Sequence, residues 1–335
     1  MKRIYTLFLS LVCFTAVCSF GQTVSNVDAY QEGKNIIITY DTDKEGCVGG
    51  VYCSTDGGNT WSNPLRRVTG DVNKLVPAGS HRIVWDVLSE REKLAGANIC
   101  FKVEANSGRF SVNGVSFEMV RVEGGTFRMG ATSEQEDEAD GDEKLVHSVT
   151  LNSYYIGKTE VTQALWQAVM GSNPSHFKGA DLPVEFVTWN EFQEFIQKLN
   201  RLTGSNFRLP TEAEWEFACR GGNNSCGYKY SGSNNLGSVA WYDDNSDGQT
   251  HPVATKAPNE LGIYDMSGNV YEWCSDWYAN YTSNSQTNPK GPQSGSDRVC
   301  RGGGWYGHVR RCRSSFRMYS NPTIRYNDLG LRLAL

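Results

Sequence analysis

Cysteine is the residue type in this sequence with the most chemistry to offer. The 335-residue chain has ten cysteines, of which Cys13 and Cys18 lie in its first twenty residues. The others form an N-terminal group (Cys47, Cys53, Cys100) and a C-terminal group (Cys219, Cys226, Cys274, Cys300, Cys312). In an oxidising compartment, disulfides within each group would leave one thiol over in each, because both groups are odd in number. No Cys-x-x-Cys pair is present, which argues against a zinc cluster.

Carboxylates gather in one place, the acidic run from Glu134 to Glu143. Such a cluster can attract a cation, but a solvated loop is the interpretation that we favour. The net charge of −5 and the lack of a basic stripe with interleaved aromatic residues argue against a nucleic-acid partner.

The N-terminal residues predict export. Lys2 and Arg3 precede an apolar run that ends at Phe20, and no basic stop-transfer flank follows it. We therefore expect residues 1–21 to be a signal peptide and the mature protein to be periplasmic, displayed at the cell surface or secreted. Lipidation at Cys18 and an uncleaved anchor are the open alternatives.

Residues 22–106 predict a small all-β, immunoglobulin-like sandwich. Asn35–Tyr40, Arg82–Asp86 and Ile99–Val103 are β-rich segments. Between them, Ser54–Trp61 matches the Asp-box pattern, in which an aspartate caps the turn of a hairpin and a tryptophan packs beneath it. A single copy of this pattern indicates a structural turn.

Residues 110–335 predict a second domain with short elements. An alternating strand from Phe117 leads into a glycine turn at Gly130, and Glu160–Met170 and Asn190–Leu202 have helical apolar spacing. Thr211 and Glu214 form a capping box that begins a third helix. From Gly221 onward periodicity is almost lost, so an irregular structure there needs a further source of stability, for which bound calcium is a common solution.

Six segments of this second region together resemble the formylglycine-generating-enzyme (sulfatase-modifying factor) family. They are Gly124–Gly130, Lys158–Thr162, Arg208–Glu216, Pro258–Trp273, Arg298–Gly304 and Leu329–Arg332. The resemblance implies an α+β fold, the C-type-lectin-like formylglycine-generating-enzyme fold with much irregular structure.

The resemblance also implies calcium. By position, Asp265 and Glu272 would supply side-chain oxygens, and Gly268 and Val270 backbone carbonyls, which are the hard donors that Ca²⁺ prefers. Pairing of Glu272 with a nearby arginine is the alternative. A second family site falls on Ser238, Val239, Asn245 and Asp247, where Ser238 replaces an asparagine.

The family's copper chemistry is only half matched. Active members oxidise a substrate cysteine to formylglycine through two copper-binding cysteines, which correspond here to Gly307 and Cys312. Cu(I) prefers a pair of soft thiolates, so we expect copper not to bind and Cys312 to be at most a remnant of the site. Two other enzyme classes also lack support, since neither a short-spaced histidine motif for iron nor a Gly-x-Ser-x-Gly element is present.

The C-terminal segment, Gly304–Leu335, further resembles the variable region of retroelement-diversified proteins, which use the same scaffold. The positions reachable by adenine alteration are Tyr306, Gly307, His308, Val309, Arg310, Tyr319, Ser320, Thr323, Ile324, Tyr326 and Asp328. The framework positions are Trp305, Cys312, Arg313, Arg317, Gly330 and Arg332. Met318 does not fit the scheme, and an ordinary divergent family tail is the alternative.

These features predict a binding module more strongly than an enzyme. Rigid aromatic and basic side chains are typical of recognition surfaces because they offer large contacts at small entropic cost. We expect a protein or glycan ligand to contact six residues: Trp305, Tyr306, His308, Arg310, Tyr319 and Tyr326. The alternative is an active oxidase that converts a cysteine of an exported sulfatase-type protein.

Overall fold

The computed structural model describes residues 23–44, 46–62, 65–72, 74–90, 94, 98–105, 108–135 and 139–335. The predicted signal peptide lies outside these residues, and so does Cys18. The chain forms two compact units. The first comprises Met1–Gly108 and Gly204–Asn206, and the second comprises Arg109–Thr203 and Phe207–Leu335. Within the described part of the chain, none of the helices has the length and apolarity that a membrane span requires.

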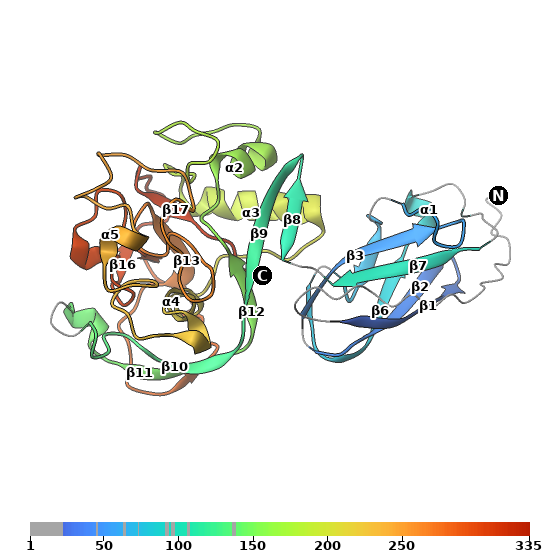
Figure 1. The fold of residues 1–335 in the computed structure, drawn as a ribbon, viewed down its shortest axis with the longest axis horizontal. Helices are drawn as coiled ribbons and strands as arrows, with labels where there is room; N and C mark the ends of the chain where they lie inside the picture. Colours follow the sequence, from blue (N-terminus) through green and yellow to red (C-terminus); the bar gives the residue numbers. More distant parts are fainter. Residues whose placement is uncertain are drawn as a thin grey trace. The chain divides into compact units, whose positions relative to one another are not determined.

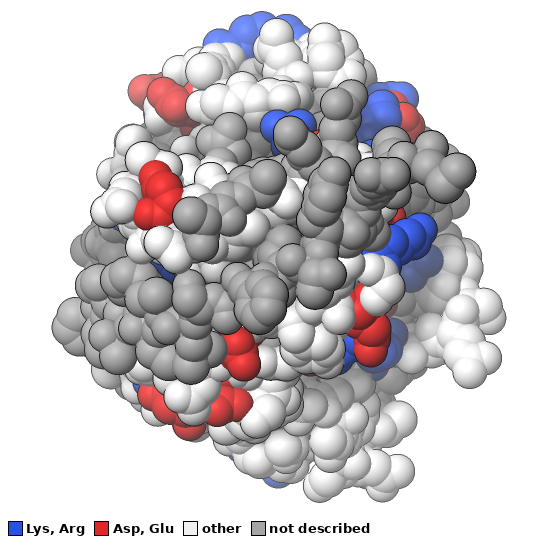
Figure 2. Space-filling model, turned by 90° about the vertical axis from the view of Figure 1, so that its right-hand side faces the viewer, with Lys and Arg blue, Asp and Glu red and all other residues white. Residues whose placement is uncertain are grey.

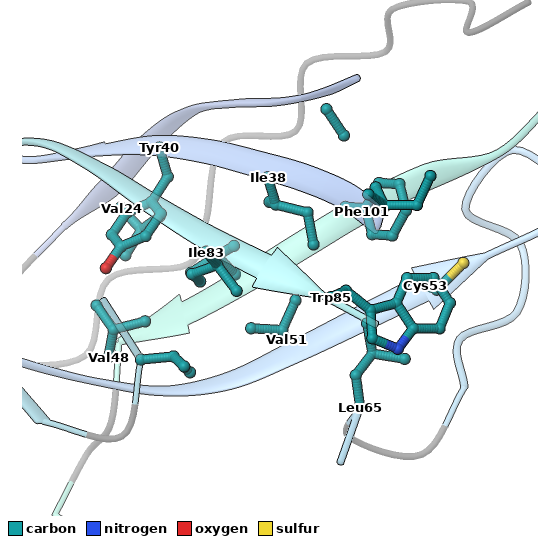
Figure 3. Packing of buried hydrophobic residues seen from close by; sticks show 14 of the residues in the cluster. Val24, Ile38, Tyr40, Val48, Val51, Cys53, Leu65, Ile83, Trp85 and Phe101 are labelled. Atoms are coloured by element: carbon teal, nitrogen blue, oxygen red, sulfur yellow. The ribbon is translucent and has the colours of Figure 1, made fainter. Parts of the chain in front are cut away.

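The first unit contains two antiparallel sheets, with strand orders β1-β2-β6-β4 and β5-β3-β7 (Figure 1). Its elements are β1 (Val24–Glu32), β2 (Asn35–Thr42), β3 (Gly46–Ser54), β4 (Val68–Gly70), β5 (Lys74–Val76), β6 (Gly79–Trp85), α1 (Val87–Glu90) and β7 (Cys100–Ala105). Buried side chains of both sheets form one core, in which Ile38 and Ile83 face Val51 and Phe101 (Figure 3). The three predicted strands are found as β2, β6 and β7. The immunoglobulin-like assignment stays a prediction.

The predicted Asp-box turn follows β3. Asp56 accepts hydrogen bonds from the Thr60 backbone N–H at 2.9 Å and from its hydroxyl at 2.6 Å. These donors, the hydroxyl first, lower the pKa of Asp56 to about 2. The chain then runs back beside β3, where Leu65 N donates to Val51 O, but β4 pairs with β6 in the other sheet. The turn is therefore formed without a two-stranded hairpin between β3 and β4.

The described residues of the second unit form three small sheets and four α-helices. The sheet orders are β12-β9-β8, β10-β11-β14 and β16-β15-β13-β17. The strands are β8 (Arg109–Val112), β9 (Val115–Val122), β10 (Gly125–Met129), β11 (His147–Leu151), β12 (Tyr154–Gly157), β13 (Tyr271–Trp277), β14 (Gln286–Thr287), β15 (Arg298–Arg301), β16 (Met318–Ser320) and β17 (Leu329–Leu331). The helices are α2 (Gln163–Met170), α3 (Trp189–Thr203), α4 (Glu212–Cys219) and α5 (Leu236–Val239).

Capping residues set the helix bounds. The Thr211 capping box begins α4 as predicted, with Thr211 Oγ1 accepting from Glu214 N and Glu214 Oε2 from Thr211 N. Helix α2 begins at Gln163 and not at Glu160, because the Thr162 hydroxyl caps it by accepting from Leu165 N. Glu160 therefore lies in extended chain, and its side chain is free to turn into the core.

Buried ion pairs hold the irregular part of the second unit together. Arg301, Arg313 and Arg332 are each 0% exposed. The pairs are Arg301–Glu216, Arg313–Glu143, Arg317–Glu212, Arg332–Glu272 and Arg220–Glu134. The expectation of a solvated loop at Glu134–Glu143 is therefore wrong at Glu143, which is buried beside Arg313, whereas Glu134 beside Arg220 is half-buried.

Surface charges are mixed. Figure 2 shows one face of the molecule, on which Lys and Arg side chains lie among Asp and Glu side chains. The exposed pair Arg310–Asp140 and the half-exposed pair Arg325–Glu191 show the same mixing beside the C-terminal segment.

Candidate functional site

Cys312 lies at the end of a 3-10 turn, Val309–Cys312, and is 0% exposed. Its neighbours are the apolar side chains of Leu236, Val239 and Ala240. This burial, with a smaller contribution from Asp243, raises the pKa of the thiol to about 12. A protonated and enclosed thiol is a poor nucleophile and a poor metal ligand.

Gly307, the position of the missing cysteine, lies in a tight turn. Its backbone N–H donates to Gly304 O at 2.7 Å. A Cβ placed on Gly307 would come within 2.9 Å of that same oxygen and 3.1 Å of Gly304 N. The backbone around Gly307 is thus fitted to glycine, and a cysteine there requires the turn to move.

The five cysteines of the C-terminal group are free thiols. Two of the buried thiols point to backbone oxygens and not to another sulfur. Cys219 Sγ lies 3.7 Å from Met266 O, and Cys300 Sγ lies 3.8 Å from Arg298 O. Cys100 is also free, whereas the side chain of Cys47 is outside the described part of the structure.

The predicted calcium turn begins at Asp265, which is 3% exposed and has a positive φ of 58°. Its Oδ2 accepts from Ala254 N at 2.7 Å, but its Oδ1 is buried without a hydrogen-bond partner. Burial raises the pKa of this carboxyl to about 6. A buried oxygen with no donor is suited to a cation.

Glu272 is held differently from Asp265. Arg332 Nη2 donates to Glu272 Oε1 at 2.6 Å, and Trp215 Nε1 donates to Glu272 Oε2 at 2.6 Å. The alternative raised for Glu272, an arginine partner, is therefore what the structure contains. Of the two predicted carboxylates, only Asp265 has an oxygen without a donor.

Glu160 joins this cluster, although the sequence did not single it out as a site residue. Its two oxygens accept from Val270 N at 3.1 Å and from Asn269 Nδ2 at 2.8 Å. Burial, followed by the charges of Asp265 and Glu272, raises its pKa well above the ordinary value. Glu272 thus pairs with Arg332, and Glu160 and Asp265 lie near enough for the Arg332 charge to lower their pKa values against the larger effect of burial.

The remaining predicted calcium residues are backbone positions or turn residues. Gly268 has a φ of 81°, and a Cβ there would come within 2.3 Å of Trp241 O, so only glycine fits. At the second predicted site, Asn245 Oδ1 accepts from Tyr242 N and Asp247 is exposed. Across the described residues, no three Asp, Glu, His or Cys side chains converge on one metal position.

The predicted ligand residues are mostly exposed. Tyr306 is 73% exposed, Tyr319 53% and Tyr326 42%, and His308 and Arg310 are also exposed. Trp305 is half-buried. Single exposed apolar side chains are normal on a protein surface, whereas a contiguous exposed apolar patch indicates an interaction site.

These residues form two groups. In the first, Trp305 stacks at a tilt beside Tyr306, with ring centroids 5.6 Å apart, and its Nε1 donates to Asn327 O, next to Tyr326. In the second, Arg310 pairs with Asp140, and Tyr319 packs on Tyr278 with ring centroids 4.3 Å apart. His308 caps the turn before Arg310, because its Nδ1 accepts from Arg310 N.

Comparison with known proteins agrees with this geometry. The family model described as "Sulfatase-modifying factor enzyme 1-like domain" matches residues 107–335. A "Chaperone protein LppX" from Paenibacillus barcinonensis is 36% identical over 299 residues, covering 74% of this chain and 98% of that protein. The mouse formylglycine-generating enzyme is 35% identical over 207 residues, and the match covers 53% of this chain and about half, 54%, of the enzyme.

Two solved structures are similar to the chain. "Treponema denticola variable protein 1" has a TM-score of 0.61 at 37% identity, covering 68% of this chain and 97% of that one. PvdO from Pseudomonas aeruginosa has a TM-score of 0.57 at 26% identity, covering 67% of this chain and 98% of that one.

Proposed function

Because residues 107–335 make this chain a member of the sulfatase-modifying factor family, we propose that it is an exported binding module built on an enzyme's fold. The exposed side chains of Tyr306, His308, Arg310, Tyr319 and Tyr326, together with Trp305, form its ligand face. The ligand is a protein or a glycan.

One observation carries this proposal: seven of the eleven positions proposed as variable are exposed, although Gly307 and Ser320 are buried, and five of the six framework positions are buried. Among the positions proposed as variable, Tyr306, His308, Arg310, Tyr319, Thr323, Ile324 and Tyr326 are exposed. The framework positions Cys312, Arg313, Arg317, Gly330 and Arg332 are buried. A surface of rigid aromatic side chains on a buried frame suits recognition and has no need of a reactive group.

The state of the copper positions supports the same conclusion. Gly307 has no thiol and no room for one, and Cys312 is enclosed with its proton retained. The names of two similar proteins, a chaperone protein and a variable protein, describe no oxidase. The competing function, oxidation of a cysteine in an exported protein, rests on family membership alone.

The test that separates the two functions uses the full chain. The protein is loaded with copper and incubated with a Cys-x-Pro-x-Arg peptide, and formylglycine is sought by mass spectrometry. We expect none, and any product that disappears in Cys312→Ala would overturn the binding-only proposal.

Calcium is the second part of the proposal. The residues fit such an ion because Asp265 Oδ1 is buried without a donor inside an acidic cluster. Asp265 and the backbone carbonyls of Gly268 and Val270 would hold it, and Glu272 would contribute mainly through its pairing with Arg332. When bound, calcium would neutralise the cluster and tie together chain segments that share few regular hydrogen bonds.

Export and diversification complete the proposal. A signal peptide over residues 1–21 is tested by N-terminal sequencing of the protein after cell fractionation, and lipidation at Cys18 by the mass of the mature N-terminus. Diversification requires a near-copy of the last coding bases beside a reverse transcriptase gene; without one, the segment is an ordinary divergent tail.

A further inference from the structure

Glu185 lies where two loops that hold Trp305 meet. Its side chain is 0% exposed, and its Oε1 accepts from Phe177 N at 2.9 Å. The Phe177 ring packs edge-on against Trp305, with ring centroids 5.4 Å apart and an interplanar angle of 90°. Glu185 is thus connected to the ligand face through one residue, Phe177.

The second loop reaches the same place from the C-terminal segment. Phe186, the neighbour of Glu185, donates its backbone N–H to Tyr326 O at 2.9 Å. Two residues along, Asp328 is near enough for its charge to raise the pKa of Glu185. Trp305 Nε1 donates to Asn327 O at 2.9 Å, so this loop too is fastened to Trp305.

The Glu185 carboxyl is only half satisfied. Its Oε2 is buried and has no hydrogen-bond partner. Burial is the main cause that raises the pKa of Glu185 to about 7, against the opposing effects of the His176 and Phe177 amides and of Lys178. An ionised carboxylate at this place would carry a buried charge without a donor, next to a second carboxyl.

Other charged groups around Glu185 do not remove this charge. The Lys178 ammonium is exposed and donates to Asn173 O at 2.9 Å. Burial raises the pKa of Asp328, and Arg311 acts in the opposite direction on it. His176 is exposed and packs against Phe177 with ring centroids 4.8 Å apart, so substitution of this histidine is the matched control.

We propose that Glu185 is a positioning residue of the ligand face, whose buried carboxyl must stay uncharged for the Ser175–Phe177 and Tyr326–Asp328 loops to remain against Trp305. The importance for recognition rests on the proposed function, whereas the conformational effect does not. When the proton is lost, the buried anion favours an arrangement in which water reaches Glu185 and the two loops separate from Trp305.

The direction of the pH effect follows from the coupling between protonation of Glu185 and closure of the two loops. A carboxyl whose pKa is higher in the closed arrangement than in the open one favours closure at low pH, and this advantage fades as pH rises toward 7. With an ordinary glutamate pKa in the open state, local opening should increase roughly 10- to 100-fold between pH 5.5 and 8.5.

Hydrogen exchange of the full chain without ligand tests the proposal. After correction for the intrinsic exchange rate, protection in peptides covering Ser175–Phe177 and Trp305–Asp328 should fall, as pH rises, by that factor more than protection in α3 does. Glu185→Gln keeps an acceptor for Phe177 N–H and adds no charge, so this additional fall should be absent from the variant. His176→Gln should behave like the wild type.

Two results would overturn the proposal: equal pH dependence in wild type and Glu185→Gln, or loss of the dependence in His176→Gln. Should Glu185→Gln fail to fold, a carbon-13 titration assigned to the Glu185 carboxyl of the wild type decides instead, and titration of this carboxyl near the ordinary value of about 4.3 excludes the proposal. Neither measurement depends on copper, peptide oxidation or ligand, so it can fail while the binding function stands.

Discussion

The Arg313 guanidinium donates to both oxygens of the Glu143 carboxylate, at 2.7 Å in each case, although 170 positions separate the two residues. Both side chains are 0% exposed. Burial alone would raise the pKa of Glu143, but the hydrogen bonds from Arg313 and Ser315 keep it below the ordinary value. This pair fastens the C-terminal segment to the loop that precedes β11.

Removing one partner of this pair should be costly. Arg313→Ala leaves the Glu143 charge buried without compensation, for which we expect about 3–5 kcal/mol less stability in urea unfolding. Arg310→Ala breaks the exposed pair with Asp140, which joins the same two segments, and should cost at most about 1 kcal/mol. Similar losses of unfolding free energy in both variants would show that the buried pair stabilises the protein no more than the exposed pair does.

Substitutions on the ligand face should affect binding and not stability. Tyr306→Ala and Tyr326→Ala remove exposed side chains, so each should change the free energy of unfolding by about 0.5 kcal/mol or less. On protein and glycan arrays, both should lose the signal of the wild type. Tyr30→Ala, an exposed tyrosine of the first unit, is the matched control and should bind normally. Unchanged binding by both face variants would place the ligand elsewhere.

Chelation should destabilise the protein if calcium fills the Asp265 turn. At a calcium concentration 100-fold above Kd, adding EGTA should lower Tm by roughly 5–10 °C in differential scanning fluorimetry. Asp265→Asn should remove this response. Asp247→Asn, at the second predicted site, should keep the response to EGTA. The reason is that Asp247 is exposed and the nearby Asn245 Oδ1 already accepts a hydrogen bond from Tyr242 N. Identical melting curves with and without EGTA would exclude a stabilising calcium ion.

Restoring the missing cysteine should not restore a copper centre. In Gly307→Cys the new Cβ meets Gly304 O at 2.9 Å, so the turn must move, at a cost of about 1–3 kcal/mol. The buried Cys312 thiol also keeps its proton at neutral pH. Competition with a chromogenic Cu(I) chelator should therefore give no tight site in this variant. A stoichiometric tight site would mean that the turn relaxes more easily than its contacts indicate.

Asp276 should make the protein less stable as pH rises. Burial, followed by the Glu212 charge, raises the pKa of Asp276 to about 7. A raised carboxyl pKa contributes stability that is present at low pH and is lost as pH rises toward 7. Between pH 5 and 8, Asp276→Asn should therefore lose less stability than the wild type, by on the order of 2–3 kcal/mol in urea unfolding. Parallel pH profiles for the two proteins would exclude this role.

Local features of the chain were readable from sequence because short-range rules govern them. The Thr211 capping box, the Asp56 turn and the three sequence-predicted strands of the first unit each depend on neighbours within a few positions. The family could be recognised from the sequence for a related reason, because its short motifs occur in the same order along this chain. The missing copper thiol, Gly307, is likewise a property of one position.

The partners of the buried charges needed the tertiary structure. A glutamate in an acidic run has the same local pattern whether it is solvated or bound to an arginine 170 positions away, as Glu143 is. Glu160 and Glu185 were missed for this reason, since neither periodicity nor spacing shows that a carboxyl turns inward and keeps an unusual protonation state. The sequence alone thus determined the family and the absence of a second copper thiol. Only the fold decided which charges are buried and which tyrosines are exposed, because burial depends on contacts between segments distant in the chain.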